Sequence, residues 1–200
     1  MNTTPSYYLD PVDFDPFAGP AIEQVVPLAK PQQEIWLSCK LGGDDASRCY
    51  NESVSLQLNG QLNQQALELA LQALILRHQA LRSTFKSDGT EILIYQNLPF
   101  KLIFSDLSSQ NPSDQQKSIK QFIEHESLQT YDLENGPLFR TTLFKLSAEE
   151  YYFTLSAHHI ICDGWSLGVL LLDLSKLYTA HQQNLPPQLP EAPQMSLYIT

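Results

Sequence analysis

Two adjacent histidines, His158 and His159, are followed closely by an aspartate and a glycine, Asp163 and Gly164. Histidine changes charge near neutral pH, so a partly desolvated, neutral imidazole can accept a proton from an attacking nucleophile. The pair lies near the end of a segment, residues 151–161, whose alternating apolar and polar residues predict a strand. Because successive side chains of a strand point to opposite faces, the two histidines cannot share one task. His159 is the candidate general base.

The residues after the histidines are expected to support the site. Asp163 immediately precedes a predicted helix, where its carboxylate would cap the helix or pair with an arginine beneath the site. Gly164 allows the backbone a sharp turn. Trp165, at the start of the helix, needs no role other than packing in the core.

Two other interpretations of the histidine pair remain open. Histidines are often buried for structural reasons, without a catalytic task. A metal site built from His158, His159 and Asp163 is disfavoured, because neighbouring side chains of a strand point apart, and we expect no metal.

The elements that must position these residues are mixed along the chain. Apolar spacing predicts helices at residues 31–37 (ended by Gly42 and Gly43), 63–78 (capped by Asn63), 112–130 (capped by Ser113, with Ile119, Phe122, Ile123 and Leu128 facing inward) and 165–181. Strand patterns occur at residues 50–58, 81–85, 92–95, 139–146 and 151–161. This order lacks the steady alternation of a doubly wound sheet and therefore predicts an α+β fold, a mixed β-sheet with helices packed against it.

Composition excludes several classes of protein. The chain has 200 residues, of which 42% are hydrophobic, and a net charge of -10, so a single core is possible and the basic footprint of a nucleic-acid binder is missing. The longest apolar runs are four residues, far short of the roughly 20 that span a membrane. Three cysteines without C-x-x-C spacing suggest reduced thiols, and the N-terminus lacks a secretory signal. We therefore expect a cytoplasmic protein that binds neither nucleic acid nor membrane.

Proline-rich passages divide the chain into three parts. Residues 1–24 carry four prolines and no regular apolar period, as expected of a leader or interdomain linker. Residues 25–185 form the predicted globular part. A second proline-rich passage occupies residues 186–200.

Four segments together resemble one known family. The string from His158 to Gly164 is similar to the H-H-x-x-x-D-G signature of nonribosomal peptide synthetase condensation domains and, more broadly, of chloramphenicol-acetyltransferase-like acyltransferases. Residues 31–37 resemble the family's A-Q-x-x-x-W segment, with Pro31 at a place where small residues are usual. Residues 77–85 resemble R-H-E-x-L-R-T-x-F, with Gln79 and Ser83 as departures, and residues 131–140 resemble F-D-L-x-x-G-P-L-x-R.

The resemblance implies a fold and a reaction. It implies a chloramphenicol-acetyltransferase-like lobe in which residues 25–185 are the N-terminal lobe of a condensation domain and residues 186–200 begin the crossover to a C-terminal lobe. Such a domain joins an acyl or peptidyl thioester to an aminoacyl thioester. Both are carried on phosphopantetheine arms of donor and acceptor carrier proteins, and no cofactor is bound directly. The lobe alone is expected to be inactive.

The resemblance also suggests roles for individual residues. His159 would lie where the two substrates meet, either as a base or as a group that positions the amine and stabilises the intermediate. The backbone N–H of Gly164 would approach the substrate, and Trp165 would line the tunnel. Arg82 would belong to a polar cluster that holds the histidine loop, although the arginine that pairs with Asp163 stays open. Two alternatives are another H-H-x-x-x-D-G acyltransferase that uses coenzyme A and a non-catalytic scaffold lobe.

Overall fold

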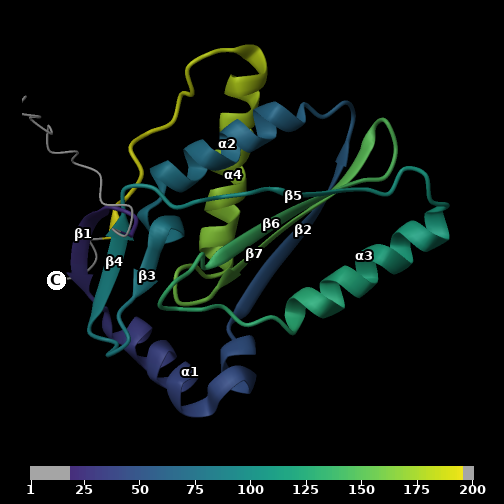
Figure 1. Cartoon of the computed structure of the whole chain (residues 1–200). Helices are drawn as coiled ribbons and strands as arrows, with labels where there is room; N and C mark the ends of the chain where they lie inside the picture. Colours follow the sequence, from purple (N-terminus) through teal and green to yellow (C-terminus); the bar gives the residue numbers. More distant parts are fainter. Residues whose placement is uncertain (1–18, 196–200) are drawn as a thin grey trace, which may run out of the picture.

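The computed structural model describes residues 19–195, which form two β-sheets and four α-helices (Figure 1). Residues 1–18 of the predicted leader (residues 1–24) and residues 196–200 of the predicted crossover therefore lie outside the described residues. The elements in chain order are β1 (Ile22–Pro27), α1 (Lys30–Arg48), β2 (Asn51–Asn59), α2 (Gln64–Arg77), β3 (Ser83–Phe85), β4 (Glu91–Tyr95), β5 (Ile103–Asp106), α3 (Pro112–Ser127), β6 (Phe139–Lys145), β7 (Glu150–His158) and α4 (Gly164–Gln183).

The larger sheet has the strand order β2-β7-β6-β5, in which β5 runs parallel to β6 and the other pairs are antiparallel. It is therefore a mixed sheet, and the predicted α+β class is confirmed. A smaller antiparallel sheet, β1-β4-β3, stands beside it (Figure 1).

The two faces of the larger sheet differ in chemistry. One face of β2 and β7 carries apolar side chains and packs under α2 and α4, which contact each other. The opposite face carries small hydroxyl side chains and lies under α3. This difference follows from the alternation of side chains along each strand. The apolar face includes Leu56, Leu58, Phe153 and Leu155, and the polar face includes Ser53, Ser55, Thr154 and Ser156.

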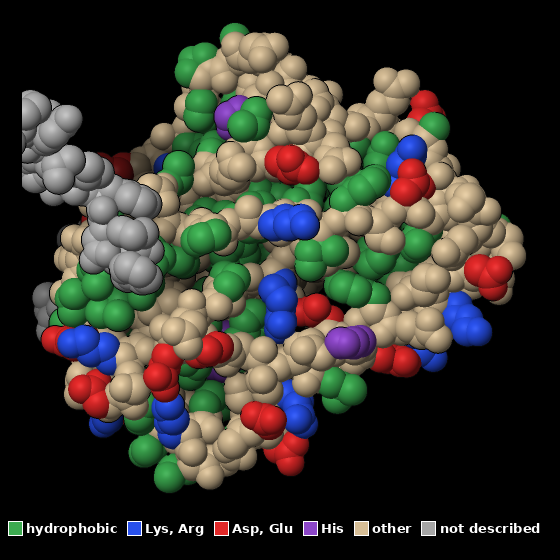
Figure 2. Space-filling view, viewed as in Figure 1, with side chains coloured by type: hydrophobic (Ala, Val, Ile, Leu, Met, Phe, Trp, Pro, Cys, Tyr) green, Lys and Arg blue, Asp and Glu red, His purple; other side chains and the backbone are tan. Residues whose placement is uncertain are grey.

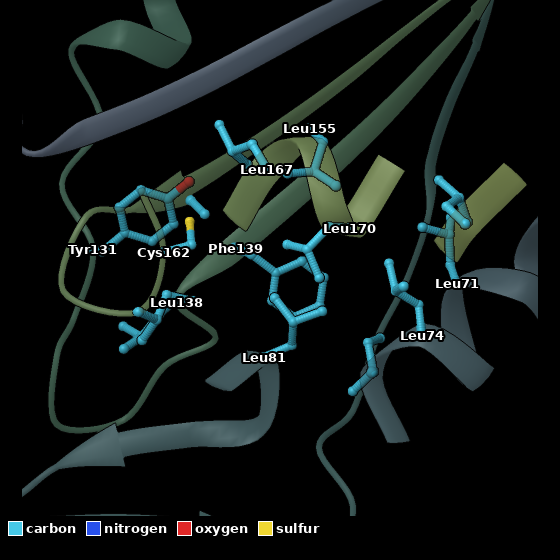
Figure 3. Packing of buried hydrophobic residues seen from close by; sticks show 14 of the residues in the cluster. Leu71, Leu74, Leu81, Tyr131, Leu138, Phe139, Leu155, Cys162, Leu167 and Leu170 are labelled. Carbon is cyan, nitrogen blue, oxygen red and sulfur yellow. The ribbon is translucent and has the colours of Figure 1, made fainter. Parts of the chain in front are cut away.

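The core lies between the apolar face and the helix pair (Figure 3). Asn63 caps α2 by accepting a hydrogen bond from the Ala66 amide, as predicted. From there the buried side chains of α2 recur every three or four residues and form one stripe. The core members shown in Figure 3 include Leu71, Leu74, Leu138, Phe139, Leu167 and Leu170.

The expectations about helix ends are confirmed for the first helix and wrong for α3. α1 consists of two helical pieces that meet at Gly43, whose φ of 62° and ψ of -150° are not helical, so the first piece ends at the glycine pair as predicted and a second piece runs on to Arg48. A positive φ suits glycine, which has no Cβ to clash, so Gly43 can interrupt the helix and redirect the chain. In α3 the cap is Asn111 rather than Ser113, and the helix ends at Ser127.

The predicted inward face of α3 is also wrong in part. Ile119 and Phe122 are half-buried, but Ile123 and Leu128 are exposed, and no residue of the helix is fully buried. Because α3 covers the hydroxyl-bearing side of the sheet, it does not need a continuous apolar stripe.

Some strand boundaries also differ from the expectation. β1 and β5 were not predicted, and β1 pairs with β4 from Ile22 onward, so the last residues of the predicted leader belong to the sheet. In place of a strand over residues 81–85, a short 3₁₀ turn (Gln79–Arg82) precedes β3. β7 ends at His158 rather than at residue 161.

The distribution of charged side chains on the surface agrees with the composition, which lacks a basic excess. On the face shown in Figure 2, acidic and basic side chains are interspersed, without a continuous basic area. No helix within residues 19–195 is long and apolar enough to cross a membrane.

Candidate active site

The loop between β7 and α4 is held by backbone hydrogen bonds at its start. The His158 amide donates to the Leu138 carbonyl at 2.9 Å, and the His159 amide donates to the Tyr50 carbonyl at 2.7 Å. A tight turn follows, in which the Ile161 amide donates to the His158 carbonyl. His159 therefore lies just beyond the strand but is still tied to the chain that leads into β2.

His158 is fully buried and contacts three separated segments. Its Nδ1 accepts a hydrogen bond from the Ile160 amide at 3.2 Å. The proton of the neutral ring must then sit on Nε2, which faces Cys39 Sγ of α1 at 3.7 Å. The rings of Tyr50 and Tyr131 pack beside it, with centroid distances of 5.9 and 6.0 Å.

Burial gives His158 a structural role. Desolvation, together with the nearby charge of His159, lowers the pKa of His158 to about 4, so this ring is neutral at pH 7. Because both of its nitrogens are engaged inside the protein, His158 positions the loop and does not reach a substrate.

His159 is placed differently. Its side chain is 36% exposed, yet Nδ1 is buried and lies 3.1 Å from Oε1 of Glu52 on β2. The carboxylate is at ion-pair distance but is not aligned as a hydrogen-bond acceptor. The ring stacks on Tyr50 at a centroid distance of 6.4 Å. Of its two nitrogens, only Nε2 is left to face a reactant, as general base chemistry requires.

Asp163 caps α4. Its Oδ1 accepts hydrogen bonds from the amide of Ser166 at 2.8 Å and from the hydroxyl of the same residue at 2.7 Å. These bonds, the one from the amide first, lower the pKa of Asp163. Of the two roles expected for this carboxylate, helix capping is confirmed. Among the described residues no arginine pairs with it.

Gly164 and Trp165 form the first turn of α4. A Cβ added at Gly164 would meet no atom within 4 Å, so its backbone is open to an incoming group. Trp165 is 83% exposed, which excludes the interpretation that it packs in the core. Both residues lie on the open surface at the start of the helix that follows the histidine loop.

Arg82 is not part of the histidine loop. Its buried guanidinium pairs with Glu23 of β1 at 2.5 Å and donates to the Tyr95 carbonyl at the end of β4. It therefore ties the small sheet together. The expectation that it holds the histidine loop is wrong, because the turn of residues 79–82 directs its side chain towards β1.

The other motif residues brace the frame of the site. Gln32 of α1 donates to the Ile160 carbonyl at 3.2 Å. Arg77 and His78, at the end of α2, both contact Asp173 Oδ2 of α4, at 2.8 and 2.9 Å. These contacts hold α1 against the histidine loop and α2 against α4.

Cys162 anchors the loop in the core. It lies beside Tyr131 and Leu138 in Figure 3 and is buried. Desolvation, followed by the nearby charges of Glu52 and Asp163, raises the pKa of Cys162 to about 12. The thiol is therefore neutral and serves as an apolar contact rather than as a nucleophile.

Sequence reasoning missed Glu52 and Cys39. Glu52 occupies a position on β2 that shares a face with Val54, Leu56 and Leu58, so a carboxylate in an apolar register was the available signal. Cys39 offered no local signal, because α1 and β7 meet only in the folded chain. Within residues 19–195 no three potential metal ligands cluster together.

Comparisons with known proteins point in one direction. A family model described as Condensation domain matches residues 22–200. Malpinin synthetase from Mortierella alpina is 37% identical over 155 residues, which are 78% of this chain and 2% of that protein. One of the linear gramicidin synthase proteins of Brevibacillus parabrevis is 34% identical over 173 residues, which are 86% of this chain and 2% of that protein. The chain thus spans only a small part of these relatives.

Solved structures agree with the fold. The crystal structure of the starter condensation domain of rhizomide synthetase matches with a TM-score of 0.80 at 24% identity. The match covers 88% of this chain and 44% of that one. At this identity the likeness shows the fold alone.

Proposed function

The chain belongs to the condensation-domain family and covers its N-terminal lobe, and from this premise we propose that it supplies one half of an amide-forming site. The donor is an acyl or peptidyl thioester and the acceptor is the amine of an aminoacyl thioester. Each is carried on the phosphopantetheine arm of a carrier protein. The product is the elongated chain on the acceptor carrier.

The proposed amide-forming reaction needs a single general base. The acceptor amine attacks the thioester carbonyl, the new C–N bond forms, and the C–S bond breaks. His159 Nε2 takes the proton that the amine loses and returns it to the departing sulfur. Holding both thioesters at bonding distance contributes a large share of the rate, on the order of 7 to 11 kcal/mol of the barrier.

One observation carries this proposal. His159 is half-exposed while its Nδ1 is buried beside Glu52, and His158 next to it is buried and neutral. Both ring nitrogens of His158 have partners inside the protein, whereas of His159 only Nδ1 is buried. The exposed Trp165 and the open backbone of Gly164 extend the site along the start of α4.

The partner of this lobe is proposed to be the remainder of the condensation domain. The His159 side chain is 36% exposed, and it lines neither the groove beneath α3 nor the groove between β2 and α4. We propose that the C-terminal lobe covers the surface around His159 and completes the substrate path. The described lobe should then be inactive by itself.

Reconstitution tests the function. A complete condensation domain that contains this chain is mixed with a donor thioester on one carrier protein and an aminoacyl thioester on another, and the products are measured by mass spectrometry. Amide is expected only when both loaded carriers are present. The 200-residue chain alone should give no amide above background.

The same test, with one further arm, also distinguishes two alternative functions. A donor supplied on coenzyme A that reacts as fast as the carrier-bound donor would favour a coenzyme A acyltransferase. An absence of product in every arm with the complete domain would favour a scaffold lobe. Either result would overturn the proposed function.

A further inference from the structure

We propose that Glu52 is a positioning residue for His159, whose carboxylate orients the ring through Nδ1 and stabilises the imidazolium that forms during proton transfer. This inference rests on the proposed function, because it assigns a role within the same site. Glu52 lies outside all four motif segments and comes from the edge strand β2.

The geometry assigns the tautomer. His159 Nδ1 is buried, has no aligned hydrogen-bond partner, and lies 3.1 Å from Glu52 Oε1. A carboxylate can only accept, so its negative charge at this distance favours the tautomer with the proton on Nδ1, although the N–H is not aligned for a hydrogen bond. Nε2 then keeps its lone pair for the amine. In His158 the assignment is reversed, because the Ile160 amide donates to its Nδ1.

The position of Glu52 argues against an ordinary surface role. It lies opposite Ala157 in the pairing of β2 with β7, at the end of a face that is otherwise apolar. Neither a lysine nor an arginine in the described part of the chain pairs with it, and the group beside it that can become a cation is His159, which is charged only when protonated. The imidazolium form of His159 is therefore the cation with which the Glu52 carboxylate can pair.

The neighbouring groups leave this task to Glu52. Asp163 is also near the ring, but its carboxylate accepts hydrogen bonds from Ser166 at the start of α4. His158 on β7 and Cys162 in the loop are both neutral, and Tyr50 contributes a stacked ring. Among these groups, Glu52 is the anion that directly faces Nδ1.

The proton step follows from this arrangement. When the amine attacks, its proton passes to His159 Nε2 and the ring becomes an imidazolium with a proton on each nitrogen. The negative charge of Glu52 lies next to the proton on Nδ1 and favours this state. When the proton moves on to the leaving sulfur, the ring returns to the Nδ1–H tautomer without rotating.

The first experiment is a pH–rate profile of amide formation by the complete domain. In Glu52→Gln the plateau rate is expected to fall about 10-fold. This value lies between the few-fold effect of an exposed ion pair and the roughly 10⁴-fold effect of a buried carboxylate that orients a catalytic histidine. The acid limb should move to lower pH, because protonation of the ring loses its anionic support.

Matched variants separate this role from a structural one. Glu150→Gln removes the same charge from the opposite end of the same strand pair and should keep the wild-type profile. Glu52→Asp keeps the charge one methylene further away, and it should restore the position of the acid limb in part. A profile of Glu52→Gln that is lowered uniformly, with an unmoved acid limb, would overturn the proposal.

The second experiment does not depend on activity. ¹⁵N spectra of the histidine-labelled protein report which ring nitrogen carries the proton. His159 is expected to be the Nδ1–H tautomer in the wild type and a mixture of tautomers in Glu52→Gln. If this change occurs but no amide forms in any arm, the pairing stands and the proposed function fails. If amide forms but the tautomer is unchanged in Glu52→Gln, the pairing fails alone.

Discussion

Two roles are conceivable for Asp163, a helix cap and one half of a buried ion pair with arginine, and they predict different losses of stability when the residue is replaced. Its carboxylate accepts two hydrogen bonds from Ser166 at the start of α4 and is exposed, without an arginine partner among the described residues. Replacing it by alanine removes the cap, which typically costs about 1 kcal/mol, and the favourable contact with the helix dipole, which adds about 0.5 kcal/mol. We therefore expect Asp163→Ala to lower the free energy of unfolding by about 1 to 2 kcal/mol.

Asparagine provides the matched control. An asparagine side chain caps a helix about as well as aspartate but carries no charge, so Asp163→Asn should lose only about 0.5 kcal/mol. Urea unfolding of the three proteins, followed by far-ultraviolet circular dichroism at pH 7, measures both differences. A buried ion pair behaves otherwise, since losing one partner costs about 3 to 5 kcal/mol whichever neutral residue is introduced.

The pH dependence gives a second readout of the cap. The hydrogen bonds from Ser166 lower the pKa of Asp163 in the folded protein. The carboxylate therefore contributes its stability fully above the pKa of an unfolded aspartate, near pH 4, and loses it as the pH falls through the lower folded value. The difference between wild type and Asp163→Ala should shrink below about pH 4. A loss above about 3 kcal/mol in Asp163→Ala, or equal losses in both variants, would refute helix capping as the role of this residue.

Three further outcomes are expected. In an NMR titration the ring of His158 should stay neutral from pH 8 to pH 5, because burial holds its pKa near 4; protonation near pH 6.5 would contradict its burial. Arg77→Ala should lower the free energy of unfolding by about 3 kcal/mol, because buried Asp173 loses its cation. As a control, Arg48→Ala removes an exposed ion pair and should cost less than about 1 kcal/mol. Equal losses in urea unfolding would be evidence against the buried pair. Cys39 should react with a thiol reagent in the unfolded protein and stay protected in the native one, and rapid native labelling would exclude its contact with His158.

Local patterns were sufficient to predict most of the elements around the histidines. The spacing of apolar residues in α2, the cap at Asn63 and the alternation in β2 depend on neighbours within a few positions, so they can be read from the sequence. The same holds for Asp163 as the cap of α4. The resemblance of the four motif segments then pointed to the family that the comparisons show.

Features that depend on distant contacts could not be predicted in this way. β1 is a strand because it pairs with β4, and its short, proline-ended sequence carries no strong pattern of its own. The hydroxyl-bearing face of the sheet decides that α3 keeps few buried side chains. The turn before β3 sends Arg82 to Glu23 rather than to the histidine loop.

The candidate site shows the same limit. Alternation predicted that the two histidines have different environments, and they do, although β7 ends at His158 and the loop itself places His159. The partners of these rings come from elsewhere: Cys39 from α1 and Glu52 from β2. Glu52 comes close to Nδ1 of His159 only because β2 pairs with β7, and this long-range contact cannot be predicted from a short stretch of sequence.

Replacement of His159 in a complete condensation domain tests the role of this residue most directly. The measurement is the single-turnover rate of amide formation from two carrier-bound thioesters, with His125→Ala on exposed α3 as the control. His159→Ala should lower the rate by about 10² to 10⁴, the usual contribution of a general base, while His125→Ala keeps the wild-type rate. A His159→Ala domain that forms amide at the wild-type rate would show that the reaction does not use this histidine.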